Sequence, residues 1–103
     1  PKWMTYLLNK DETVVEDFAR FGLNVMGIQD QGDDMANAKA GIVALQSFIK
    51  DELHLPTSLS EVGINDEKFD ELKVKACYGQ DALSRAYRSL SQEDCLNIYK
   101  MCL

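Results

Sequence analysis

The chain has 103 residues, a formal net charge of −6, and 46% hydrophobic and 27% charged residues. The length predicts one domain, residues 1–103, and the composition is that of a folded protein rather than a disordered one. The acidic excess argues against a nucleic-acid partner, because such binding depends on clustered Lys and Arg. No apolar run approaches the ~20 residues of a membrane helix and no signal peptide is recognisable, so we expect no membrane partner.

Apolar residues recur at helical spacing through most of the chain, and no alternating pattern predicts a strand. A short first helix is expected around residues 3–8. Thr13 and Glu16 have the spacing of a capping box that opens a second helix, which residues 27–32 end. Asp33 suits the start of a third helix, because a carboxylate accepts free backbone N–H groups there.

The third helix should run until Pro56, which cannot continue it. Its apolar positions at helical spacing predict one buried face, and its small residues leave room for a neighbouring helix to pack closely. The buried face comprises Ala38, Ile42, Leu45, Ile49 and Leu53, with Phe48 alongside, and the small residues are Ala36, Ala38, Ala40 and Gly41.

The second half of the chain contains shorter helices. Ser58 and Glu61 form another capping-box pattern for a turn or two, and Asn65 is expected to cap a further helix with Phe69 on its inner side. Residues 78–89 lack a clean period and are expected to form a loop. Ser91 then opens a terminal helix. The whole pattern predicts an all-α bundle of about five helices.

Few residues have the spacing of a catalytic or metal site. The single histidine, His54, has no suitably spaced ligand partner and is better explained as a residue at a helix C-terminus. The acidic run 30–34 lacks the glycine and the bidentate Glu of a calcium loop, so we interpret it as a helix cap with solvated charge. No phosphate-binding glycine loop is present. We therefore expect no catalytic residue and no metal ligand in this chain.

The three cysteines do not form a C-x-x-C pair and are odd in number, which favours reduced thiols and a cytoplasmic location. Cys95 and Cys102 lie two turns apart on one helical face, where buried structural thiols belong. Cys77 instead precedes an irregular loop that contains glycine. No base is evident beside any of them, so a structural thiol is the simplest interpretation.

A series of short phrases gives the sequence a family resemblance. PKWMTY (1–6), DFARFGLNVMGI (17–28), AGIVAL (40–45), LPTSLSEVGI (55–64), RAY (85–87) and LSQED (90–94) follow one another in the chain. In this order they resemble iron-containing alcohol dehydrogenases of the butanol dehydrogenase type, in their C-terminal helical part. Each phrase alone is weak, but the series covers essentially the whole chain.

The resemblance implies a parent enzyme with a Rossmann-like N-terminal domain that binds NAD(P)H and a helical C-terminal domain, as in dehydroquinate synthase-like folds. A divalent metal, iron or zinc, sits between them on one Asp and three His. Those ligands precede the PKWMTY phrase in relatives, so His54 matches none of them. In some relatives a cysteine before the final helix lies near the nicotinamide, and Cys77 is the plausible counterpart.

We therefore expect the C-terminal part of a metal-dependent, NAD(P)H-linked alcohol dehydrogenase or aldehyde reductase, inactive alone and supporting the active-site cleft. Its partners would be the N-terminal nucleotide-binding domain and the metal-bearing helices of the parent. Apolar surface around Trp3, Met4 and Leu7 would be exposed and invite self-association. The alternative is a free-standing helical interaction domain without catalysis.

Overall fold

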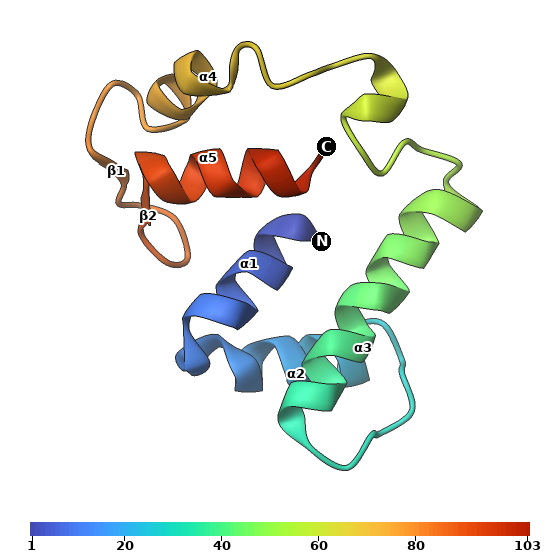
Figure 1. Ribbon diagram of the computed structural model, residues 1–103. Coiled ribbons are helices and arrows are strands. Elements are labelled where there is room, and N and C mark those ends of the chain that lie inside the picture. The colour runs from blue at the N-terminus through green and yellow to red at the C-terminus, as the bar shows by residue number, and fades with distance from the viewer. The chain divides into compact units, whose positions relative to one another are not determined.

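A computed structural model describes residues 1–103 as a mainly helical chain with five α-helices and one small pair of strands, which confirms the predicted fold class (Figure 1). The chain divides into two compact units, Pro1–Thr57 and Ser58–Leu103. Each unit has its own helix pair and is described separately below. That residues 1–103 act as one domain stays a prediction.

The first unit begins with α1 (Lys2–Lys10), followed by a 3-10 turn (Glu12–Val14) and α2 (Val15–Asn24). The capping box predicted at Thr13 and Glu16 is wrong. Asp11 caps the turn instead, because its Oδ1 accepts hydrogen bonds from the Thr13 backbone N–H at 2.9 Å and from the Thr13 hydroxyl at 2.6 Å. Since the turn begins at Glu12, Thr13 already lies inside it and cannot open it.

The third helix, α3 (Asp34–Ser47), begins as predicted, with the Asp33 carboxylate accepting the backbone N–H of Ala36 at 2.9 Å. α3 packs against α2 where both helices carry glycine, which agrees with the small-residue face expected on this helix (Figure 1). A Cβ on Gly41 would lie only 2.6 Å from the Cα of Gly22. The two backbones are therefore in direct contact, with no side chain between them.

The predicted buried face of α3 is correct only in its first half. Ala38 and Ile42 are buried, but Phe48 and Leu53 are 45% and 48% exposed. For Leu53 the reason is a change of helix type, because a π-helical turn (Phe48–Glu52) follows α3 and the Leu53 N–H donates to the Phe48 carbonyl. A π-turn bonds residues five apart, so positions beyond it leave the 3.6-residue face.

The second unit contains a 3-10 turn (Ser60–Val62), α4 (Phe69–Ala76) and α5 (Gln92–Met101). Ser58 accepts the Glu61 N–H, as predicted. The expectation that Asn65 caps α4 is wrong. Its side chain accepts the Glu67 N–H at 3.1 Å in a turn that precedes the helix, and α4 itself begins at Phe69 without a side-chain cap.

α4 and α5 lie side by side (Figure 1) and are in contact through aromatic residues. Phe69 is 2% exposed, and its ring centroid lies 5.6 Å from that of Tyr99. The helix start predicted at Ser91 is confirmed, and it is a capping box: Ser91 Oγ accepts the Asp94 N–H at 3.1 Å and the Asp94 carboxylate accepts the Ser91 N–H at 2.8 Å. These two features fix both ends of the helix pair.

The loop predicted between α4 and α5 contains a short antiparallel ladder that the sequence did not indicate. β1 (Ala82–Leu83) pairs with β2 (Leu90–Ser91), with Ala82 opposite Ser91 and Leu83 opposite Leu90. Two residues per strand are too few to show an alternating pattern. The ladder brings the chain back to α5 and buries Leu90 beneath the loop.

Candidate functional site

Cys77, the one residue singled out for a place near a cofactor, lies at the C-terminal end of α4. Its side chain is buried, with 1% of the residue exposed. The Sγ atom lies 3.9 Å from the carbonyl oxygen of Leu90, to which it donates, and 3.8 Å from Sγ of Cys95 on α5. The structure therefore pairs Cys77 with Cys95.

This pairing was missed because sequence reasoning grouped Cys95 with Cys102 on one helical face. Cys102 lies just beyond the last residue of α5 and is only partly buried. The usable signal was the position of Cys95 relative to Leu90, which has the spacing of a hydrophobic staple around the Ser91 cap. A staple residue points toward the segment that enters the helix, and here that segment packs on the end of α4.

The electrostatic surroundings of Cys95 favour protonated sulfur. Burial, together with the neighbouring Cys77 and the Asp94 carboxylate, raises the pKa of the Cys95 thiol to about 11. A thiol of this kind is a weak nucleophile at neutral pH, because the thiolate is the reactive form. The pair is thus a structural contact in its resting state.

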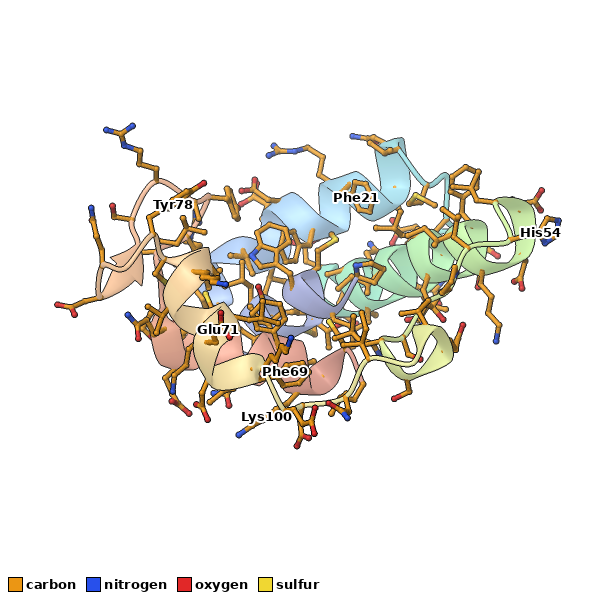
Figure 2. All side chains as sticks on the ribbon, turned by 90° about the horizontal axis from the view of Figure 1, so that it is seen from above. Phe21, His54, Phe69, Glu71, Tyr78 and Lys100 are labelled. Atoms are coloured by element: carbon orange, nitrogen blue, oxygen red, sulfur yellow. The ribbon has the colours of Figure 1, made fainter.

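A hollow of about 620 Å³ opens beside Cys77, within the second unit. Its wall is the loop that follows α4, whose backbone turns through left-handed conformations at Tyr78 (φ 54°) and Gly79 (φ 74°). Tyr78 is 84% exposed and projects from this loop (Figure 2). The hollow is lined by Cys77, Tyr78, Gln80, Ala82, Leu83, Ser84, Arg85 and Ala86. A small molecule in the hollow would therefore meet one cationic side chain, amide and hydroxyl groups, and apolar side chains.

The metal-ligating residue types do not converge. No group of three or more His, Cys, Asp or Glu side chains lies close enough to hold a metal ion. His54 is exposed beyond the π-turn with a left-handed backbone (φ 54°), at the outer end of its segment (Figure 2). The buried thiol pair and this lone imidazole do not fit the donor set of a catalytic iron or zinc.

The acidic run 30–34 forms a capped loop built around a residue that the sequence analysis did not single out. Asn37 is 3% exposed, and its Oδ1 accepts the Gln31 N–H at 2.7 Å while its Nδ2 donates to Asp30 Oδ1 at 3.0 Å. The same Asp30 oxygen accepts the Gly32 N–H at 2.9 Å. These bonds hold the pKa of Asp30 below its usual 3.8, chiefly through Asn37.

The expected apolar patch around Trp3, Met4 and Leu7 is wrong. Met4 and Leu7 are 8% and 2% exposed, and the Trp3 ring lies 5.9 Å from the Phe18 ring between centroids. Large apolar side chains are exposed elsewhere instead. They include Val25, Val43, Phe48, Leu53 and Leu55 in the first unit, and Val62, Ile64, Val74 and Tyr78 in the second. None of the helices combines the length and apolar character needed to cross a membrane.

Comparisons with known proteins agree with the order of phrases in the sequence. The profile of the Fe-containing alcohol dehydrogenase family, C-terminal, matches residues 1–103. NADH-dependent butanol dehydrogenase A of Clostridium acetobutylicum is 31% identical over 100 residues, and NADH-dependent butanol dehydrogenase B of the same organism is 30% identical. Each alignment covers 97% of this chain and 25% of the relative, so the chain spans about a quarter of their length. No solved structure matches.

Proposed function

The chain belongs to the Fe-containing alcohol dehydrogenase family, as its C-terminal portion, and from that premise we propose that it is the helical support of an NAD(P)H-linked alcohol dehydrogenase or aldehyde reductase. The parent polypeptide carries out the reaction, and these residues hold the active-site cleft in shape without catalysing alone. The observation that carries the proposal is the match of the whole chain to the butanol dehydrogenases.

The metal and the coenzyme belong to the parent enzyme in this proposal. A divalent metal supplies Lewis-acid polarisation of an alcohol or aldehyde oxygen, and the nicotinamide exchanges hydride. Because the donors in residues 1–103 do not fit such a metal, we assign its ligands to other parts of the polypeptide.

Cys77 keeps its proposed place near the nicotinamide. Its position on the wall of the hollow supports this placement, because Ala82 and Leu83 also line the hollow and would give a flat ring apolar surface to contact. Its role there is to shape the wall rather than to react, since its sulfur already donates to the Leu90 carbonyl. A cytoplasmic location is part of the same proposal, supported by three free cysteines.

The exposed apolar side chains support an extensive contact with the rest of the parent. Val25 and Val43, on and beside the α2–α3 pair, are 70% and 64% exposed. Large apolar side chains left this open are typical of surfaces that another chain or domain covers. We propose that the nucleotide-binding domain and the metal-bearing helices cover them.

An exchange of segments tests this function. The matching quarter of butanol dehydrogenase A is replaced by residues 1–103, and metal content and aldehyde-dependent NADH oxidation are measured. We expect the chimera to bind one metal per chain and turn over, whereas the truncated relative and residues 1–103 alone do neither.

Two outcomes would contradict the proposal. Hydride exchange by residues 1–103 alone would assign catalysis to this chain. A folded, metal-loaded chimera without turnover would instead favour a free-standing interaction domain. Circular dichroism of the chimera confirms folding before either result is interpreted.

A further inference from the structure

Two sulfur atoms from different helices meet in the second unit, and nothing in the proposed function uses them both. Cys77 ends α4 and Cys95 lies in the first half of α5, with 3.8 Å between the sulfur atoms. A disulfide needs a separation of about 2.05 Å, so the sulfurs are about 1.8 Å from bonding distance. We propose that Cys77 and Cys95 form a redox-sensitive pair that a small hydroperoxide converts into a disulfide linking α4 to α5.

The backbone around Cys77 can supply the required movement. Cys77 is the first residue beyond α4, and its N–H bond to the Lys73 carbonyl is long at 3.4 Å. The left-handed turn at Tyr78 and Gly79 follows at once. The Cys77 carbonyl accepts the Gln80 N–H at 2.9 Å in the turn beyond the helix, so the weaker of its two backbone bonds is the one to the helix. Closing the gap therefore stretches the last turn of α4 rather than its body.

Access for the oxidant comes from the hollow, because Cys77 borders it and Cys95 does not. Only 1% of Cys77 is exposed, so the surrounding loop must open before a peroxide reaches its sulfur, and the first attack then falls to Cys77. The second sulfur then lies close enough to complete the bond without unfolding of the helix pair.

The chemistry balances in two steps. The Cys77 sulfur attacks one peroxide oxygen, the O–O bond breaks, and water or an alcohol leaves, giving a sulfenic acid at Cys77. The Cys95 sulfur then attacks the Cys77 sulfur, the S–O bond breaks, and water leaves as the S–S bond forms. The two thiols lose two electrons and two protons together, and the hydroperoxide is reduced by them.

The disulfide between Cys77 and Cys95 would restrict the segment that forms the hollow. It closes a covalent ring that contains β1, β2 and the loop between them, and so holds the wall of the hollow in one conformation. This device does not depend on the proposed dehydrogenase function, because it uses only residues of the second unit.

Tryptic peptide mapping tests the pair in the full-length protein. Cleavage after Lys and Arg places Cys77 in peptide 76–85, Cys95 in peptide 89–100 and Cys102 in the separate peptide that begins at Met101. The folded protein is treated with hydrogen peroxide, alkylated, digested and analysed by mass spectrometry. We expect peptides 76–85 and 89–100 to appear cross-linked, with a mass lower by two hydrogens, and to separate on reduction.

Substitutions define the order of the steps. Cys95→Ser should stop the reaction at a sulfenic acid on Cys77, trapped by dimedone, whereas Cys102→Ser should leave the cross-link unchanged. Cys77 and Cys95 remaining as thiols at a peroxide dose that oxidises Cys102 would overturn the proposal. A cross-link from either to Cys102 would also overturn it. The mapping of the unaltered protein stands even where a serine variant fails to fold.

Discussion

The two units join their main helix pairs in opposite ways. In the first, α2 and α3 touch through backbone at Gly22 and Gly41, and a single added carbon would collide. In the second, α4 and α5 are spaced by the Phe69 and Tyr99 rings and by the Cys77 and Cys95 sulfurs. A contact between backbones is sensitive to added atoms, and a contact between large side chains is sensitive to their removal. The following substitutions test this difference.

Phe69→Ala should produce the largest loss. Removing a fully buried aromatic ring leaves a cavity and costs about 3–5 kcal/mol of unfolding free energy, and Phe69 is 2% exposed against Tyr99. Denaturant unfolding measures the loss. Val74→Ala on the same helix, where the side chain is 40% exposed, is the matched control and should change stability by less than about 0.5 kcal/mol.

The same variant tests the prediction that residues 1–103 form one domain. The protection of backbone amides against hydrogen exchange is measured peptide by peptide. It should fall across the whole chain if both units unfold together. A loss confined to residues 58–103 would show that the units unfold separately and would contradict the single domain.

Gly41→Ala should come next. A Cβ there lies 2.6 Å from the Gly22 Cα, which is backbone and cannot rotate away, so α2 and α3 must separate. We expect a net loss of about 1–3 kcal/mol, although alanine favours a helix more than glycine does. Lys39→Ala, at an exposed position of the same helix, controls for helix propensity. A more stable Gly41→Ala protein in thermal unfolding would refute the close approach of the helices.

Asn37→Ala should cost about 1–3 kcal/mol, because it removes two hydrogen bonds of a buried side chain, each worth about 0.5–1.5 kcal/mol net. These are the bond from the Gln31 N–H to Asn37 Oδ1 at 2.7 Å and the bond from Asn37 Nδ2 to Asp30 Oδ1 at 3.0 Å. Asn37→Asp keeps that acceptor but loses the donor to Asp30 and places two carboxylates together. An alanine variant as stable as the unaltered protein, by denaturant unfolding, would show that the loop does not depend on this side chain.

The parts of the fold that could be predicted are those with a local sequence signal. Regular α-helices with an intrinsic cap, such as those opened by Asp33 and Ser91, follow from local spacing and were found. The π-turn after Ser47 and the two-residue strands carry no period of their own, so nothing in the sequence indicated them. Local signals located the starts of α3 and α5 but not those of α2 and α4, which begin without a side-chain cap.

The candidate site shows the same limit. Cys77 was singled out by the family resemblance, as the counterpart of a cysteine before the final helix, and the structure shows it beside a hollow. Its partner Cys95 is 18 positions away in sequence, and only the return of the chain through β2 brings the two together. Asn37 was overlooked for a related reason, because a buried amide inside a helix has no sequence pattern that separates it from an exposed one.

Ser91→Ala should have a smaller effect on the second unit. It removes the side chain that accepts the Asp94 N–H, and loss of a helix N-cap costs typically about 1 kcal/mol. Ser89→Ala, two positions earlier and exposed, is the matched control. Thermal unfolding compares the two variants, and equal midpoints would show that burial of Leu90 and Cys95, rather than the cap, holds the start of α5.

The smallest expected effect concerns the charge of Asp30, and it depends on pH. The hydrogen bonds from Asn37 and from the Gly32 N–H lower the pKa of Asp30 from 3.8 in the folded chain. A carboxyl group with a depressed folded pKa stabilises the fold above its unfolded pKa and loses that contribution as pH falls through the folded value. Asp30→Asn should therefore be less stable than the unaltered protein near pH 7, and the difference should shrink below pH 3.8.

Asn37 provides the control for this titration. Because its side chain is the largest cause of the shift, the Asn37→Ala background should reduce the pH-dependent difference that the Asp30→Asn substitution produces. Urea unfolding at a series of pH values measures the effect of that substitution in both backgrounds. A difference that stays constant from neutral to acidic pH would mean that Asp30 acts through its shape and hydrogen bonds alone. The charge of Asp30 would then add nothing to the stability of this loop.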